Sequence, residues 1–257
     1  VDISTLDIHG CYIFNPGGTN HFLFNDSNGG YKSLTMSPSD WGFNQDVKRK
    51  YYALDMYLSH PFDGKWQARV DYTFSRSWGN TEGQVRSDLE QSDVSKTEDW
   101  DAPELMIGSG GLLSNNRRHQ LKAYGSYQFT PEWMVSGALR IQSGTPKTCL
   151  GRFGTDQSDP IGYGGDYHYC FGKLSGPGAT GNTPWTKKID LSVAYRPAFA
   201  DHKLAFSASV FNVLNERSET NVVPRSQPDV NTVSNTYGMG TYFQAPRYVR
   251  LSMSYDY

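Results

Sequence analysis

The chain has 257 residues, of which 19% are charged, and a formal net charge of −2 at pH 7. No stretch approaches the roughly 20 apolar residues of a membrane-spanning helix, which excludes a helical membrane protein. The small negative charge provides no basic surface, so we expect no nucleic-acid partner.

Apolar and polar residues alternate along most of the chain, as in strands with one apolar and one polar face. The clearest example runs from Lys65 to Trp78. This alternation predicts strands at 48–59, 65–80, 116–129, 133–145, 185–196, 203–215 and 246–257. A weaker strand at 1–9 brings the predicted number to eight, and no segment is predicted to be a helix.

The predicted connections alternate between short and long. Tight turns rich in Pro and Asp are predicted at 60–64, 130–132 and 197–202. Loops of 30 to 39 residues are predicted at 10–47, 81–115, 146–184 and 216–245. In an up-and-down antiparallel sheet, every second connection lies at the same end. Outer-membrane β-barrels have this arrangement, with short periplasmic turns and long extracellular loops.

In a membrane barrel the apolar face points toward lipid, whereas in a soluble β-sandwich it points toward the protein core. Alternation alone fits both. The apolar rows carry aromatic residues at the turn end, where an interfacial girdle is expected: Trp66, Phe129, Trp133, Tyr195 and Tyr257. The predicted strands are also longer than those typical of globular sheets. We therefore interpret the chain as all-β, an antiparallel up-and-down transmembrane β-barrel. The residues expected to face lipid include Trp66, Val70, Phe74, Leu139 and Leu191.

Several segments resemble a known family. The segments KRKYYALDMYLSHPFDGKWQARVDYTFSRSWGNTEGQVRSD, DWDAPEL, NNRRHQLKAYGSYQFTPEW and IQSGTPKTCLG resemble the C-terminal part of Oar-like TonB-dependent receptors. SASVFNVLNERSE and PRYVRLSMSYDY are similar to the last two strands of TonB-dependent barrels in general.

This resemblance implies a bacterial outer-membrane receptor whose barrel has 22 strands, and residues 1–257 would supply the last eight. An N-terminal plug and an inner-membrane TonB complex are the implied partners, besides the lipid and the rest of the barrel. No plug or TonB box is present in these residues. Strand 1–9 is short and loses its alternation between Ile3 and Leu6, so we expect the chain to be incomplete as a barrel. We also expect strand 1–9 not to close it against 246–257.

Two other functions stay open at this point. A complete eight-stranded outer-membrane barrel could act as an adhesin or anchor, and a soluble β-sandwich could bind carbohydrate. No nucleophile motif, Walker loop, dinucleotide fingerprint or His-pair zinc motif appears. We therefore expect no enzyme, and no catalytic, cofactor or metal site. His119 is not expected to be catalytic, and GSGGLL at 108–113 is interpreted as a flexible loop.

Charged residues on the polar rows are candidates to line the lumen of a large barrel, or to fill the core of a small one. They are Asp55, Arg69, Asp71, Lys122, Arg140, Lys188 and Asp190. Aromatic residues in the loop 146–184 could contact a ligand or pack the loops on one another. They are Tyr163, Tyr167, Tyr169 and Phe171.

The three cysteines fit no metal-ligand spacing, which favours a disulfide formed in an oxidising compartment. We expect Cys149 and Cys170 to pair within one Gly-rich loop, and Cys11 to be free or to pair upstream. The loop 81–115 is acidic and could hold a structural calcium ion. Its spacing matches no defined calcium loop, so a solvated acidic loop is the favoured interpretation.

Overall fold

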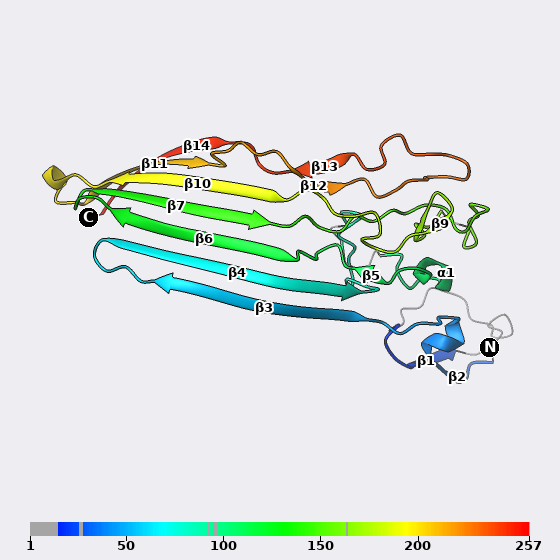
Figure 1. Ribbon diagram of the computed structural model, residues 1–257. Helices are drawn as coiled ribbons and strands as arrows, with labels where there is room; N and C mark the ends of the chain where they lie inside the picture. Colours follow the sequence, from blue (N-terminus) through cyan, green and yellow to red (C-terminus); the bar gives the residue numbers. More distant parts are fainter. Residues whose placement is uncertain (1–14, 26–27, 92, 95–96, 163, 257) are drawn as a thin grey trace.

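The computed structural model describes residues 15–25, 28–91, 93–94, 97–162 and 164–256. Seven long strands form one antiparallel sheet in the order β14-β11-β10-β7-β6-β4-β3 (Figure 1). They are β3 (Arg49–His60), β4 (Trp66–Gly79), β6 (His119–Gln128), β7 (Trp133–Gln142), β10 (Thr186–Tyr195), β11 (Leu204–Phe211) and β14 (Tyr248–Tyr255). All seven confirm predicted strands. The eighth, at 1–9, lies outside the described residues.

Consecutive long strands pair with each other, so the sheet is an up-and-down meander with all tight turns at one end. We call this the turn end, and the opposite end the loop end. The turn between β10 and β11 contains the short 3-10 helix η3 (Ala198–Ala200). In Figure 1 the long connections gather at the loop end, beyond the ends of β4 and β7. This arrangement confirms the predicted alternation of short and long connections.

The long loops contain short elements that the sequence analysis does not predict, including a helical turn at Pro103–Met106 where no helix is expected. The hairpins are β1 (Asn20–Asn25) with β2 (Tyr31–Met36), β8 (Tyr169–Cys170) with β9 (Lys173–Leu174), and β12 (Glu219–Val222) with β13 (Gly240–Phe243). The loops also hold η2 (Pro38–Trp41), α1 (Pro103–Met106) and β5 (Gly111–Leu112), which pairs with the end of β4. These elements have two to six residues, too few to produce a readable periodicity.

The register of the sheet sorts the alternating residues onto two faces. Asp71 pairs with Lys122, Lys122 with Arg140, and Arg140 with Lys188, so these four residues form one row across β4, β6, β7 and β10. Directly paired residues lie on the same side of a sheet. We call this side the polar face, and the opposite side the apolar face.

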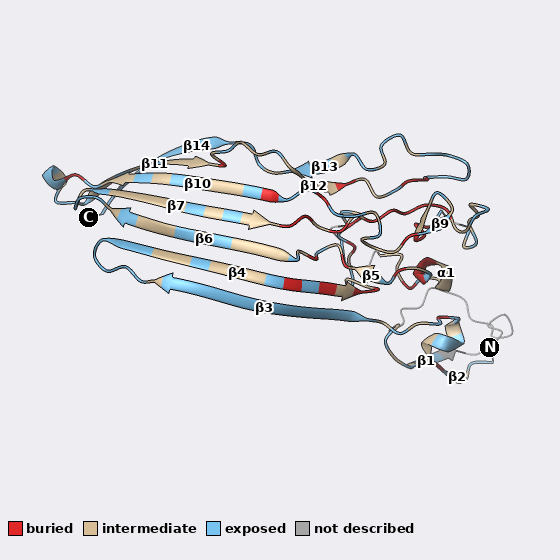
Figure 2. Cartoon of the chain, viewed as in Figure 1, coloured by how far each residue is buried: buried red, intermediate tan, exposed pale blue. Residues whose placement is uncertain are grey.

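The apolar face is exposed in the described part of the chain. Leu54 is 57% exposed, Leu191 46% and Leu251 77%. Figure 2 shows β14 exposed along its whole length and β3 along all but its last residue, and no second sheet of described residues covers the apolar face. A soluble sandwich would bury this face in its core, so the structure does not favour that alternative. Among the described residues, no helix is long and apolar enough to span a membrane.

Most fully buried residues lie in the loops. Met36, Met106, Leu150 and Tyr167 are at most 1% exposed, and Figure 2 places most of the buried residues at the loop end. A cluster of Phe43, Trp100 and Met106 joins the first two long loops, with ring centroids of Phe43 and Trp100 5.2 Å apart. The loops therefore pack against one another and form a cap with a core of its own.

Asn212, directly after β11, ties this strand to the segment that leads into β14. It is 1% exposed and has a φ of 51°. Its Nδ2 donates to the carbonyl oxygens of Glu216 (2.9 Å) and Ala245 (2.8 Å), and its Oδ1 accepts from the Glu216 N–H (3.2 Å). Asn tolerates this left-handed backbone better than most residues.

We expect Asn212→Ala to lower the free energy of unfolding by about 2 kcal/mol, because three hydrogen bonds of a buried side chain are lost. Asn231→Ala is the matched control, since Asn231 has a similar φ of 54° but an exposed side chain. Denaturant unfolding in detergent or lipid measures both variants. Equal losses would show that backbone strain, and not the side-chain hydrogen bonds, determines the effect.

Candidate functional site

The polar face carries all seven charged residues that the sequence predicts to point inward. Within β4, Arg69 forms an ion pair with Asp71 at 2.7 Å, and within β10 Lys188 pairs with Asp190 at 2.9 Å. Asp55 accepts a hydrogen bond from Thr73 on the neighbouring strand. These charges therefore lie on one surface across five strands, separate from the apolar face.

Two cations at the centre of this surface form no ion pair with any described acidic residue. Lys122 and Arg140 are directly paired on β6 and β7, and neither forms an ion pair with a described residue. Asp71, the carboxylate in their row, is already bound by Arg69. The row therefore keeps excess positive charge, which can attract an anionic group from outside the described chain.

The apolar face has a row of aromatic residues at each end. At the turn end, Trp133 and Tyr195 stack at 4.5 Å, and Phe129 lies 4.8 Å from Tyr127. Trp66, also at this end, stacks on His60 at 3.7 Å. These rings confirm that aromatic residues cluster at the turn end, with Tyr257 outside the described residues.

The loop-end row was not predicted. There, His119 lies 5.3 Å from Phe74 and stacks on Trp185 at 5.8 Å, while its Nδ1 is 2.8 Å from the Tyr72 hydroxyl. His119 is thus part of an aromatic surface. The sequence could have indicated this position. His119 is two residues before Leu121 in the alternating strand predicted at 116–129, so both side chains lie on the apolar face.

The distance between the two aromatic rows matches a membrane. Trp185, directly before β10, and Tyr195, at its end, are ten residues apart, and each stacks on a ring of the apolar face. Ten residues of strand extend about 34 Å, which corresponds to a depth of about 25 Å at the tilt usual for barrel strands. This depth equals the apolar band of outer-membrane barrels. The exposed apolar face therefore has the dimensions and borders of a lipid-facing surface.

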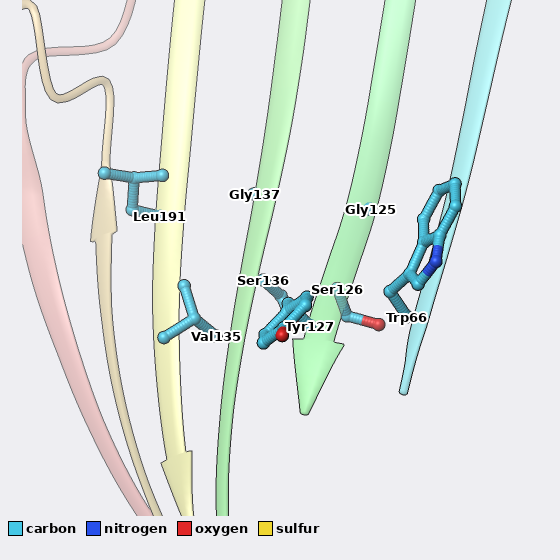
Figure 3. Close-up of a pocket in the computed structure, with 8 residues that line it drawn as sticks. All are labelled: Trp66, Gly125, Ser126, Tyr127, Val135, Ser136, Gly137 and Leu191. Carbon is cyan, nitrogen blue, oxygen red and sulfur yellow. The ribbon is translucent and has the colours of Figure 1, made fainter. Parts of the chain in front are cut away.

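A hollow of about 380 Å³ lies on the apolar face, nearer its turn end (Figure 3). It forms above the directly paired Gly125 and Gly137, between Trp66 and Tyr127 on one side and Leu191 on the other. A Cβ at Gly125 would come within 2.8 Å of the Gln67 carbonyl oxygen, so glycine is required there. The open, apolar hollow suits hydrocarbon and offers few groups to a polar ligand.

The aromatic residues of the loop 146–184 have different positions. Tyr167 is fully buried, and its hydroxyl donates to Asp159 at 2.7 Å. It takes the packing role and is not available to a ligand. Tyr169 is half-buried, with its ring 5.2 Å from Phe153. Phe171 is 45% exposed at the tip of the β8–β9 hairpin, and Tyr163 lies outside the described residues.

A disulfide joins Cys149 to Cys170, the pair that the sequence analysis expects, with a sulfur–sulfur distance of 2.01 Å. Cys149 is fully buried, and Cys170 belongs to β8. The bond fixes the exposed hairpin to the buried start of the same loop. Cys11 lies outside the described residues.

A buried charge cluster connects the acidic loop with the next one. Arg86, 5% exposed, forms ion pairs with Asp88 at 2.9 Å and Asp99 at 3.2 Å, and His168 lies beside them. Two of the acidic residues are therefore internal counter-ions and not part of a solvated surface. Among the described residues, no group of three or more His, Cys, Asp or Glu side chains could hold a metal ion.

Burial changes the proton affinity of this cluster. Burial raises the pKa of Asp99 to about 6, against the opposing effect of Arg86. Burial, together with the positive charge of Arg86, lowers the pKa of His168 to about 3. Burial alone would raise the pKa of Asp88, but the ion pair and hydrogen bond with Arg86 hold it below its ordinary value. His168 is thus neutral at pH 7.

A second ion pair extends the cluster to a third loop. Arg225 donates to both carboxylate oxygens of Asp166, at 2.7 to 3.0 Å. The Asp166 N–H in turn donates to the Glu98 carboxylate at 3.2 Å. Charged groups from 81–115, 146–184 and 216–245 therefore hold one another. Sequence analysis missed this network, because its members are far apart in the chain and follow no periodicity.

His168 and Asp99 should affect stability in opposite directions between about pH 4 and 6. The pKa of His168 is lowered by folding, so its contribution is present above about 6.5 and is lost as the pH falls. The pKa of Asp99 is raised, so its contribution is present below 3.8 and is lost as the pH rises through about 6. We therefore expect the loop cap of the wild type to have nearly constant stability across this range.

Single substitutions should reveal how His168 and Asp99 each make the stability of the cap depend on pH. With Asp99→Asn, the opening constant of the cap should rise about tenfold for each pH unit of acidification, and with His168→Gln it should fall by a similar factor. Hydrogen exchange of cap amides such as that of Tyr167, corrected for intrinsic rates, measures this. Slopes of the same sign in both variants would contradict the assignment.

Comparison with known proteins agrees with this geometry. No family model matches the chain. It is 33% identical over 195 residues to the TonB-dependent transporter Oar of Myxococcus xanthus, a match that covers 74% of the chain and 16% of that protein. The chain therefore spans about a sixth of this relative's length.

Among solved structures, the outer membrane transporter YddB of Escherichia coli matches 93% of the chain with 28% of its own length, at a TM-score of 0.53 and 12% identity. At this identity the likeness concerns the fold alone. The fold, the aromatic borders of the apolar face and the identity to Oar agree. The chain belongs to the Oar-like TonB-dependent receptors of the bacterial outer membrane.

Proposed function

We propose that residues 1–257 form the C-terminal part of the barrel of a receptor that takes up an as yet unidentified ligand by TonB-driven transport. The main support is the exposed apolar face, bounded by two aromatic rows about 25 Å apart and combined with 33% identity to a TonB-dependent transporter. The known relatives are transporters, and we propose no enzymatic role for this part of the receptor.

The edges of the sheet support a larger barrel. Among the described residues, β3 pairs only with β4 among the long strands, and β14 pairs only with β11. An unpaired strand edge is not tolerated in hydrocarbon, because its backbone groups have no partner there. We propose that further strands of the same receptor pair with both edges. These unpaired edges favour the larger barrel over the alternative of a complete eight-stranded adhesin or anchor.

The polar face would then line the lumen. Its excess charge lies at Lys122 and Arg140, whose side chains have no described acidic partner. Relatives of this family have a plug and use TonB, and the lumen is where the plug of this receptor would lie. Lys122 and Arg140 are therefore proposed contacts for acidic groups of the plug or for water between plug and wall.

The loop cap would form the outer face of the receptor. Phe171 is the best-placed of the predicted aromatic contacts, because it is exposed at a hairpin tip that the neighbouring Cys170 fixes by the disulfide. Its φ of 49° is unusual for a bulky residue, and such strain is often kept at functional sites. We propose that Phe171 contacts the ligand, with Tyr169 behind it.

Two measurements on the complete receptor test this function. A structure in lipid should show β3 and β14 paired with strands from outside these residues, and a barrel closed by residues 1–9 would overturn the proposal. Deletion of the TonB complex should abolish growth or uptake that depends on the receptor. Uptake that persists without TonB would instead favour a passive pore or an anchor.

The orientation of the two faces gives a sharper test. Leu191 and Ser192 are neighbours on β10, one on the apolar and one on the polar face, near the middle of the band. Leu191→Arg should lower stability by about 2–4 kcal/mol, because the charge enters hydrocarbon, whereas Ser192→Arg should cost much less. Unfolding of the receptor from lipid vesicles measures both. Equal costs would contradict a lipid-facing Leu191.

A further inference from the structure

Charges in the seven long strands are distributed unequally between the two faces. The acidic residues, Asp55, Asp71 and Asp190, all lie on the polar face. The charged residues on the apolar face are all cations: Lys50, Arg76 and Lys187. All three are exposed, and none forms an ion pair with a described residue. Cations without counter-ions on a lipid-facing surface require a partner of negative charge.

The three cations lie in the loop-end half of the apolar face. Arg76 is two residues beyond Phe74 on the same face of β4, whereas Lys187 lies two residues inside Trp185, toward the middle of the apolar face. Lys50 pairs with Trp78, so it is a diagonal neighbour of Arg76, and such neighbours are about 7–8 Å apart. The aromatic row marks the boundary of the hydrocarbon. Lys50 and Arg76 therefore lie at the level of the lipid headgroups, and the long side chain of Lys187 can extend to this level from inside the aromatic row.

The turn end has no such single-sign group. There, Lys65 lies beside Asp63, and Lys203 lies beside Asp201 in the turn before β11. Glu132 accepts a hydrogen bond from the Ala198 N–H, so an acidic residue also occupies the space between two turns. Among the described residues of the seven long strands, the cations of the apolar face thus all lie in its loop-end half.

We propose that Lys50, Arg76 and Lys187 bind the phosphate groups of anionic lipids in the leaflet on the loop side. Lys50 and Arg76 are close enough to share one phosphate. Lys187 is three strands from Arg76 and is level with Tyr72, four residues along the strand, so the two are about 20 Å apart at the usual strand geometry. It therefore contacts a second phosphate or a second headgroup. This proposal rests on the membrane position given above and not on TonB-driven transport.

The test uses the complete receptor in nanodiscs with spin-labelled phosphatidylglycerol or phosphatidylcholine as the probe. The variant Lys50→Gln/Arg76→Gln/Lys187→Gln removes the border cations. The matched control, Lys122→Gln/Arg140→Gln/Lys188→Gln, removes the same charge from the polar face of the same sheet. The measured quantity is the ratio of the two lipids in the motionally restricted fraction, compared with that in the bulk.

We expect the wild type and the control to prefer the anionic lipid, and the border variant to lose about threefold or more of that preference. The proposal would be overturned if the border variant kept the same preference for the anionic lipid as the control. It would also be overturned if both variants lost that preference to the same extent. If the border variant does not fold, the wild type decides the question alone. Its preference should disappear in about 1 M NaCl, where charges are screened within about 3 Å, and a preference that persists would contradict phosphate binding.

Discussion

Backbone hydrogen bonding in hydrocarbon is the constraint on which this structure depends. A strand in lipid has no water to satisfy its N–H and C=O groups, so each must pair with a neighbouring strand. The ladders that join β3, β4, β6, β7, β10, β11 and β14 contain no register shift. The shifts appear only in the β12–β13 hairpin of a loop, where water can satisfy an irregular backbone. An unbroken register also fixes the face of every side chain, which is why lipid contacts, lumen charges and aromatic borders all follow from the same pairing.

The long strands could be predicted because this constraint produces a pattern within each strand's own sequence. Apolar residues recur at every second position from Trp66 through Val70 to Phe74. The pattern continues long enough to distinguish a strand from a short apolar run. The loop hairpins could not be predicted, since β8 and β9 have two residues each and are held by packing and by the disulfide. The pairing of Cys149 with Cys170 was within reach of the sequence because the two residues share one Gly-rich loop.

The charge cluster of the cap lay beyond sequence analysis for a different reason. Arg86 and Asp88 are close in the chain, but Asp99 and His168 reach them only through the packing of two loops. An acidic loop with one arginine fits a solvated loop equally well, and nothing local distinguishes an internal counter-ion from a surface carboxylate. For His119, sequence analysis could predict the face of the sheet but not the contact. Its position in the alternation was readable, whereas its stacking on Trp185 depends on a residue from another strand.

The charge cluster of the cap has a consequence for how such receptors diversify. The charge of Arg86 is balanced by Asp88 and Asp99 from its own loop, and the cluster continues through His168 and Asp166 to Arg225 in a third loop. A buried charge that loses its partner is strongly destabilising. Loop 81–115 carries both counter-ions of Arg86, whereas the ion pair between Asp166 and Arg225 joins two different loops. Exchange of loop 146–184 or of loop 216–245 alone would separate this pair, so recombination within the cap would favour inheritance of these two loops as one block.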